Sequence, residues 1–289
     1  MKRHPQKNTV VAVDLDGTLL RDDKTASEFS LATLRRLAKA GLKIMFVTGR
    51  RERIALPVLE AIGVPGWALL NNGTLAMEWP SRRRCFTHYM CRTFLAEVIA
   101  CLEGVNRPPV ILVDPDASDR DIVIDRRLLD ADVYRVYAEH HKEFTTIADR
   151  LADSPALDRV LGMFLCEPVD DLPAYRNRLT KTMGGTVNHR ALENIEYIRG
   201  HRILEIIEPH WTKWTGITEL IGQFADEPDR IYAFGDDHND LDMLTNADVS
   251  FAPANATDAA KQAASEVVPA NNNDGVAIAL RRLFPEVFA

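Results

Sequence analysis

Short apolar runs that end in Asp, Gly or Thr alternate with helical stretches at the start of this chain. The run TVVAVDLDG is rich in β-branched residues and stops at carboxylates, as expected for a buried parallel strand that leads into a loop. Leu31, Leu34 and Leu37 then recur at helical spacing before Gly41, and LKIMFVTGR repeats the strand pattern before a helical stretch that ends at Gly63. Strand, helix, strand, helix predicts a parallel α/β sheet.

The middle of the chain breaks this rhythm. In WALLNNGTLAMEWP, Asn-Asn-Gly separates two apolar runs, which predicts a hairpin. The next hundred residues mix helical stretches with isolated strand-like runs, which indicates an inserted α+β module. We expect helices over 92–102, 133–151 and 172–183, and strands in VILVD, DIVID and RVLGMFLCEP.

The last third of the chain restores the first pattern. The alternating run RILEIIEP is expected to lead back into the first domain, and a helix from about Lys213 precedes the strand runs RIYAFGDD and DVSFA. We therefore predict a discontinuous α/β core domain, residues 1–85 and 204–289, with an α+β domain inserted at 86–203.

Composition limits the partners and the compartment. The 289 residues suffice for two domains, and a formal net charge of -7 argues against nucleic acid or an anionic membrane as a partner. The basic start MKRHPQK does not continue as a signal peptide, because Asp14 and Asp16 interrupt the apolar run VVAV. The four cysteines form no C-x-x-C pair, which favours a reducing cytoplasm.

Two acid clusters follow predicted strands. Asp14 and Asp16 are two residues apart, so both carboxylates project towards the crevice in which open α/β sheets bind ligands, and a pair of acids there favours a hard cation such as Mg²⁺. Asp236 and Asp240 follow a second strand, where a helix begins near Asn239. The alternatives are a simple Asp-Gly turn for the first cluster and helix capping for the second.

Three further residues lie at ends of predicted elements. Thr48 and Gly49 close the second strand with a hydroxyl and an unobstructed amide, which suit a phosphate oxygen. Lys213 stands where a helix begins, an unfavourable place for a cation unless an anion lies nearby. Each residue alone could be solvated surface, but the ends of parallel α/β elements converge on one side of the sheet.

In these motifs the sequence resembles the haloacid dehalogenase superfamily, and within it the subfamily with a large α/β cap that is similar to Cof-type sugar phosphatases. DLDGT, VTGR, the Lys213 region and GDDHNDLDML appear in the family's order, and NNDGVAIAL looks like its C-terminal signature. The inserted module lies where this subfamily carries its cap. The resemblance therefore implies a Rossmann-like core with an inserted α+β cap domain.

The resemblance also implies roles for individual residues. Asp14 would be the nucleophile and a metal ligand, and Asp16 would be the general acid/base while its backbone carbonyl binds Mg²⁺. Asp236 would complete the protein's metal ligands, and Asp240 would support them. The phosphoryl group would be held by the Leu15 amide, Thr48, Gly49, Lys213 and Asn239.

We expect an Mg²⁺-dependent hydrolase of a small phosphorylated metabolite, such as a sugar phosphate. A phosphomutase with the same aspartyl-phosphate, or a phosphometabolite-binding module without turnover, stays as an alternative. Trp211 and Trp214 flank Lys213 where relatives carry small residues, and we interpret both as core packing. The cap contributes no motif for the substrate, and its polar residues His88, Arg92, His189 and Arg190 are interpreted as structural.

Overall fold

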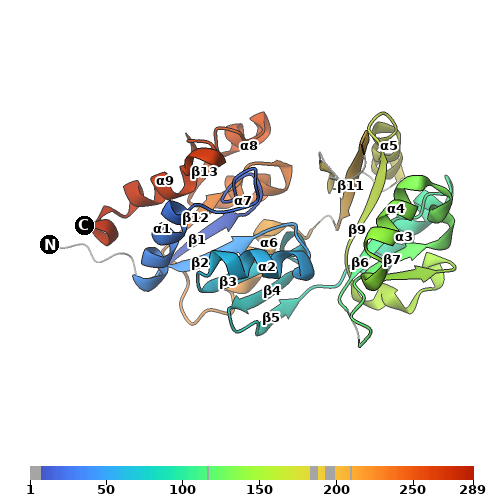
Figure 1. The fold of residues 1–289 in the computed structure, drawn as a ribbon, viewed down its shortest axis with the longest axis horizontal. Coiled ribbons are helices and arrows are strands. Elements are labelled where there is room, and N and C mark those ends of the chain that lie inside the picture. Colours follow the sequence, from blue (N-terminus) through green and yellow to red (C-terminus); the bar gives the residue numbers. More distant parts are fainter. Residues whose placement is uncertain (1–7, 116, 183–187, 193–198, 209) are drawn as a thin grey trace. The chain divides into compact units, whose positions relative to one another are not determined.

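The structure is a computed structural model that describes residues 8–115, 117–182, 188–192, 199–208 and 210–289. The basic start at residues 1–7 lies outside this description. Contacts divide the chain into two compact units, one formed by Met1–Thr87 and Trp211–Ala289 and the other by His88–His210 (Figure 1). The second unit is thus inserted into the first.

The first unit is built on an eight-stranded sheet in the order β14-β13-β12-β1-β2-β3-β4-β5. Neighbouring strands from β14 to β3 are parallel, and the β3-β4 and β4-β5 pairs are antiparallel. The strands are β1 (Thr9–Asp14), β2 (Lys43–Val47), β3 (Gly66–Leu70), β4 (Leu75–Trp79), β5 (Arg84–Thr87), β12 (Arg230–Phe234), β13 (Val249–Pro253) and β14 (Glu266–Val268).

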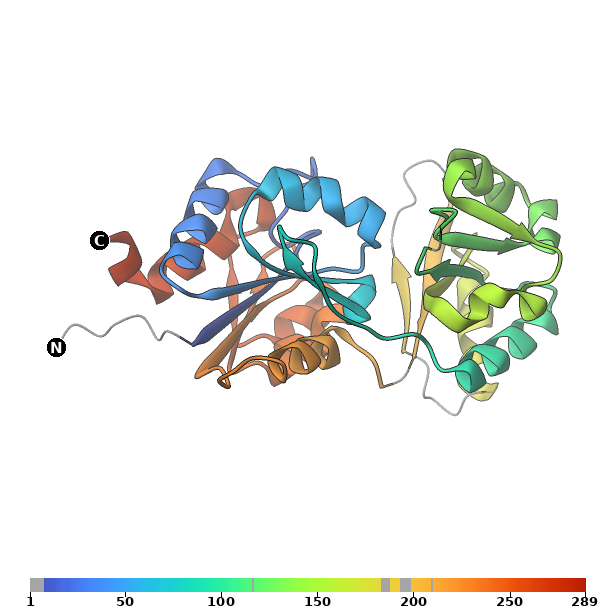
Figure 2. The ribbon, with the colours of Figure 1, turned by 90° about the horizontal axis from the view of Figure 1, so that it is seen from below.

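Helices cover both faces of this sheet. Val10 and Ala12 of β1 pack with Ile217 and Met243 on one face, under α6 and α7. Figure 2 shows the helices that follow β1 and β2, in blue, on the opposite side of the sheet from the orange helices. The helices of this unit are α1 (Glu28–Lys39), α2 (Glu52–Ile62), α6 (Lys213–Ile221), α7 (Leu241–Asn246), α8 (Asp258–Ala263), α9 (Gly275–Leu283) and α10 (Pro285–Phe288).

Local signals account for the boundaries of these elements. The Ser27 hydroxyl caps α1 by accepting a hydrogen bond from the Ser30 amide at 3.0 Å. Gly41 after α1 and Gly63 after α2 have φ of 97° and 60°, a left-handed backbone that favours glycine. β3 and β4 pair through the Asn-Asn-Gly turn, so the predicted hairpin is confirmed, as is the α/β fold.

The inserted unit is an α+β module on a second sheet, in the order β10-β11-β9-β6-β7-β8. α3 and α5 pack on one face of this sheet, whereas Tyr134 and Tyr137 of α4 pack on the other. Its elements are β6 (Val110–Val113), β7 (Ile122–Asp125), β8 (Thr145–Ala148), β9 (Val160–Pro168), β10 (Asn188–Leu192), β11 (His201–Ile207), α3 (Arg92–Glu103), α4 (Asp132–His140) and α5 (Leu172–Thr182).

Two predictions about this unit are wrong. The helix expected over 133–151 ends at His140, and the β-branched run after it forms β8, which pairs in parallel with β7. RILEIIEP was expected to lead back into the core domain, but His201–Ile207 forms β11 between β9 and β10 of the inserted sheet, where Leu204 and Ile206 are buried. The core therefore resumes at Trp211 rather than at 204, and β5 extends it to Thr87 rather than to 85.

The helices are also short. In the part of the chain that the structure describes, none has the length and apolar character that a crossing of a bilayer requires.

Candidate active site

The site is organised around the carboxyl end of β1, at the centre of the first sheet. β1 lies between β12 and β2, so the loops that follow these three parallel strands start side by side. Asp14 is the last residue of β1, Thr48 follows β2, and Asp236 follows β12. The fold thus explains how predicted site residues from distant segments meet.

Lys213 is the buried cation of the site. Lys213 is the first residue of α6, and its side chain is fully buried. Its Nζ donates to Asp14 Oδ1 and to Asp240 Oδ1, both at 2.6 Å. The Thr212 hydroxyl caps the same helix by accepting from the Thr215 amide. Two carboxylates therefore compensate both the buried charge and its unfavourable place at a helix start.

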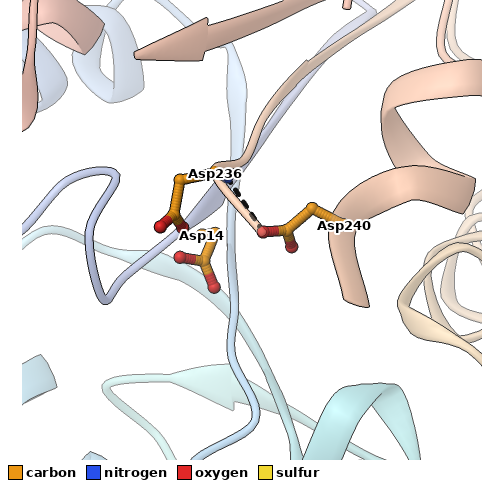
Figure 3. Close-up of side chains that lie close together, drawn as sticks. All are labelled: Asp14, Asp236 and Asp240. Atoms are coloured by element: carbon orange, nitrogen blue, oxygen red, sulfur yellow. Dashed lines mark hydrogen bonds between the residues drawn. The ribbon is translucent and has the colours of Figure 1, made fainter. Parts of the chain in front are cut away.

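Asp14, Asp236 and Asp240 form a compact acid group, shown in Figure 3. One carboxylate oxygen from each lies within 4.8 Å of the others. Burial raises the pKa of Asp14 well above its usual range despite the opposing charge of Lys213. Burial, together with the charge of Asp240, raises the pKa of Asp236 to about 6. The three carboxylates exceed the single positive charge of Lys213, and a bound divalent cation would balance the excess.

The residues present fit such a cation. Asp14 and Asp236 offer the hard oxygen ligands that Mg²⁺ prefers. Both oxygens of the Asp240 carboxylate already accept hydrogen bonds. Its Oδ1 accepts from Lys213, and its Oδ2 accepts from the backbone amide of Asp236 at 3.0 Å (Figure 3). Gly17, with φ of 78°, leaves space for the Asp236 carboxylate, since a Cβ there would lie 2.3 Å from Asp236 Oδ2. Asp14 and Asp236 could thus bind the metal, with Asp240 behind them.

The Asp16 side chain is paired with two cations. Arg50 Nε donates to Asp16 Oδ2 at 2.6 Å and Arg50 Nη2 to Oδ1 at 2.7 Å, while Lys24 Nζ lies 3.2 Å from Oδ1. Although burial opposes it, hydrogen bonds and charge from Arg50, with help from Lys24, lower the pKa of Asp16 below its usual value. The structure therefore holds Asp16 as a carboxylate.

Arg50 is a site residue that the sequence interpretation missed. It belongs to the VTGR motif, which was used only for Thr48 and Gly49. Its position directly after a glycine at a strand end was the available signal, because a cation there lies at the ligand-binding edge of the sheet.

The predicted phosphate-binding residues lie on the loops around Asp14. Thr48 is buried, and its hydroxyl accepts from the Arg50 amide at 3.1 Å. Leu15 follows Asp14 and is also buried, and Gly49 is partly exposed. Asn239 lies in a 3₁₀ turn, η6 (His238–Asp240), and its side-chain Nδ2 donates a hydrogen bond to Asn72 Oδ1.

The two tryptophans beside Lys213 pack against apolar side chains. Trp214 packs against the core cluster of the first sheet, and the Trp211 ring lies edge-on to Phe86 with 6.0 Å between ring centroids. These contacts support the interpretation of both indoles as packing.

The C-terminal segment 271–275, which includes the NNDG signature, holds the loop that follows the DLDGT motif. Asn271 and Asn272 donate to the two carboxylate oxygens of Asp22 at 3.1 and 2.7 Å. Arg21 Nη2 donates to both carboxylate oxygens of Asp274 at 3.1 and 3.2 Å. The signature at the end of the chain thus holds the loop that follows the first acid motif in place.

The polar candidates of the inserted unit have protein partners where the structure describes them. His88 pairs with Glu208 at 2.9 Å, and Arg92 pairs with Asp158. His189 and Arg190 belong to β10, and their side chains lie outside the described part of the chain.

Comparison with known proteins agrees with this architecture. The family model described as haloacid dehalogenase-like hydrolase matches residues 11–280. A Haemophilus influenzae protein is 37% identical over 280 residues, covering 94% of this chain and 97% of its own. The 5-amino-6-(5-phospho-D-ribitylamino)uracil phosphatase YitU of Bacillus subtilis is 29% identical, covering 96% and 98%. The pyridoxal phosphate phosphatase YbhA of Escherichia coli is 26% identical, covering 93% and 96%.

Solved structures show the same fold. A haloacid dehalogenase-like hydrolase from Bacteroides thetaiotaomicron superposes with a TM-score of 0.69 at 24% identity, over 96% of this chain and 99% of that one. A second hydrolase of this kind, from B. subtilis, gives 0.71 at 21% identity, over 95% and 99%. The coverage spans both units, so the inserted module is common to these structures.

Proposed function

The chain belongs to the haloacid dehalogenase-like hydrolase family, and from this premise we propose how it removes phosphate from its substrate. Its similarity to phosphatases over nearly its whole length makes it a phosphoric monoester hydrolase. The proposed enzyme depends on Mg²⁺ and forms an aspartyl-phosphate on Asp14. The observation that carries this proposal is the buried Asp14 between Lys213 and the carboxylate of Asp236.

In the first half-reaction, a carboxylate oxygen of Asp14 attacks phosphorus and the bond to the ester oxygen breaks. Asp16 donates a proton to the leaving alkoxide. Lys213 neutralises charge that develops on the phosphoryl oxygens, with hydrogen bonds from the Leu15 amide, Thr48, Gly49 and Asn239. Bound between Asp14 and Asp236, Mg²⁺ would add a second fixed positive charge at this point.

In the second half-reaction, water attacks the phosphorus of the aspartyl-phosphate. Asp16, now a carboxylate, accepts a proton from that water, and cleavage of the acyl phosphate bond returns the Asp14 carboxylate with inorganic phosphate. Arg50 and Lys24 stabilise Asp16 in the form that this step needs. The ion pair with Arg50 has to open before Asp16 can donate a proton in the first step.

The proposed substrate is a small phosphorylated metabolite, such as a sugar phosphate or a related ester. The relatives named for 5-amino-6-(5-phospho-D-ribitylamino)uracil and pyridoxal phosphate support this class. We also propose that the inserted unit selects the substrate and that the enzyme works in the cytoplasm, since all four cysteines are free thiols. A panel of phosphorylated metabolites with Mg²⁺, read out as free phosphate, identifies the substrate.

The nucleophile is tested by Asp14→Asn, which keeps the size of the side chain but removes the attacking carboxylate. We expect the release of phosphate from an aryl phosphate in Mg²⁺ to fall by more than about a thousandfold, because loss of a nucleophile removes most catalysis beyond binding. Asp242→Asn on the exposed start of α7 is the matched control and should keep normal turnover. Full turnover by purified Asp14→Asn would exclude Asp14 as the nucleophile.

A further inference from the structure

The hairpin turn η1 (Asn71–Gly73) has a backbone that only a few residue types tolerate. Asn71, Asn72 and Gly73 have φ of 49°, 57° and 91°, so three successive residues are left-handed. Positive φ at two central residues is normal in a tight hairpin, and Asn and Gly adopt it most readily. The turn type alone therefore explains the residue types but not the contacts that their side chains make.

The backbone of this turn is fastened to the loop after β2. The Asn71 amide donates to the Arg50 carbonyl and the Asn72 amide donates to the Thr48 carbonyl, both at 3.0 Å. Thr48 and Arg50 both belong to the VTGR motif. The hairpin thus continues the contact between neighbouring strands into the loop that is proposed to hold phosphate.

The turn also contacts the start of α6. A Cβ on Gly216 would lie 2.5 Å from the Gly73 carbonyl oxygen, and a Cβ on Gly73 would lie 3.0 Å from the Thr212 carbonyl oxygen. Such a close approach requires glycine on both sides. The turn therefore packs against the helix start that carries Lys213.

The side chain of Asn72 connects the turn to the loop after β12. Asn239 Nδ2 donates to Asn72 Oδ1 at 2.8 Å. The same Asn72 oxygen lies 3.1 Å from the position of a Cβ on Gly49, so the amide of Asn72 occupies the space that a side chain at 49 would need. With the bond from its backbone amide to Thr48, Asn72 is therefore in contact with three of the five residues proposed to bind phosphate.

The side-chain amides of Asn71 and Asn239 have unused hydrogen-bonding capacity. Asn71 is 6% exposed, and within the described chain neither its Nδ2 nor its Oδ1 has a hydrogen-bond partner. Asn239 Oδ1 is likewise buried without a partner among the described residues. Buried amides are seldom left unsatisfied, and a bound ligand is one reason for it. Of these atoms the Asn71 Nδ2 donor suits a phosphoryl oxygen, whereas the two amide oxygens need a hydrogen-bond donor.

We propose that Asn72 is a positioning residue for phosphate binding, and that the Asn71–Gly73 turn is a further loop of the phosphate site. Asn72 Oδ1 binds one of the two N–H groups of the Asn239 amide, which sets the orientation of that amide and directs its other N–H to a phosphoryl oxygen. Without Asn72, the Asn239 amide can rotate and present its oxygen to the anion. This inference rests on the proposed phosphatase function.

The test is a double-mutant cycle between positions 72 and 239. Asn72→Gly keeps the tolerance for positive φ but removes the acceptor oxygen, and Asn239→Ala removes the amide that it orients. We expect Asn72→Gly to raise both the KM and the inhibition constant of inorganic phosphate by about tenfold, with a smaller change in kcat. In the Asn239→Ala background the same substitution should have almost no further effect.

A matched control separates the amide from the backbone effect. Asn106 in the inserted unit also has positive φ, 52°, and is exposed, so Asn106→Gly makes the same chemical change away from the site and should leave KM unchanged. Thermal unfolding checks that each variant is folded. If Asn72→Gly fails to fold, Asn72→Ser, which keeps a polar side chain but withdraws the acceptor from Asn239, enters the same cycle.

The outcomes distinguish the two proposals. Additive effects in the cycle, or an unchanged inhibition constant of phosphate in Asn72→Gly, would overturn the role of Asn72 while the phosphatase function stands. Absence of Mg²⁺-dependent hydrolysis in the wild-type protein across the metabolite panel would instead remove the proposed function, and this inference with it.

Discussion

At the scale of single residues, the contact between Arg50 and Asp16 controls the proposed acid/base group. Arg50 binds both oxygens of the carboxylate and is the strongest influence that lowers its pKa. Such a pair favours the charged form of Asp16, which suits the attack by water but opposes protonation of the leaving group. In the proposed mechanism, this ion pair therefore favours the second half-reaction and opposes the first.

This pair leads to a prediction for the pH dependence. In the proposed mechanism, hydrolysis of an alkyl phosphate needs a protonated Asp16, so we expect kcat to fall as the pH rises through the pKa of that group. Arg50→Ala removes the partner that lowers this pKa, so the pKa rises and the alkaline limb of the kcat profile moves to higher pH. The measurement is kcat for an alkyl phosphate as a function of pH.

Lys24 provides the matched control for Arg50. Its side chain is 62% exposed and its Nζ makes a single contact of 3.2 Å with Asp16, so solvent screens its charge. Lys24→Ala should therefore shift the alkaline limb in the same direction but less. An alkaline limb that stays in place in Arg50→Ala would separate Arg50 from the acid/base step.

Site residues were only partly accessible from the sequence. Asp14, Asp236 and Lys213 stand at ends of predicted elements, so their convergence followed from the edge rule for parallel sheets and from the family motifs. Arg50 and Asn72 were missed because their roles depend on side-chain contacts, and Asn72 meets Asn239 across 167 residues of sequence. The Asn-Asn-Gly hairpin pattern already accounted for an Asn at position 72, so nothing in the sequence pointed to its contact with Asn239.

At the scale of elements, Asp125 shows how a buried carboxylate holds the inserted unit together. It ends β7, and its carboxylate accepts from the Arg127 guanidinium and from the amide of Leu151 at 2.7 Å. Although burial opposes it, the hydrogen bonds from Arg127 and Leu151 lower the pKa of Asp125. One side chain thus anchors the segment after β8 to the end of β7.

Replacing Asp125 should destabilise the inserted unit. Because its folded pKa is below the unfolded value of about 3.9, its contribution to stability is fully present above pH 4 and is lost as the pH falls through the folded pKa. We expect Asp125→Ala to lower the free energy of unfolding at pH 7 by about 3–5 kcal/mol, as for other broken buried ion pairs. The difference from wild type should shrink below about pH 4.

The two units can be followed separately in this experiment. All four tryptophans belong to the first unit, so their fluorescence reports on it, whereas far-UV circular dichroism reports on both. Asp125→Ala should shift the circular dichroism transition and leave the fluorescence transition in place. A shift of the fluorescence transition alone would contradict the assignment of this effect to the inserted unit.

At the scale of the whole molecule, the acid group at β1 makes the stability of the fold depend on pH and, through the proposed cation, on metal. The folded pKa of Asp236, about 6, is above the unfolded value of about 3.9, so without metal the folded state binds a proton that the unfolded state releases. Stability should then fall as the pH rises from about 4 to about 6. A cation bound by Asp14 and Asp236 would remove this cost and compete with the proton.

We therefore expect Mg²⁺ to raise the unfolding temperature more at pH 7 than at pH 5. At a concentration one hundred times its Kd, the added stability would be about 2.7 kcal/mol. Asp236→Asn removes one charged ligand and should reduce both the rise and its dependence on pH. An equal rise at pH 5 and pH 7, measured by calorimetry with and without Mg²⁺, would argue against metal binding by these carboxylates.

The alternation of strands and helices, the hairpin and the acids at strand ends could all be predicted from the sequence, because burial imposes periods of 2 and 3.6 on neighbouring residues. The tertiary structure decided which sheet takes β11, where the strand 145–148 forms, and which partners Asp16 and Asn239 have. These features depend on contacts between segments far apart in the chain, which arise only when strands settle next to one another. The local pattern of apolar and polar residues therefore cannot predict them.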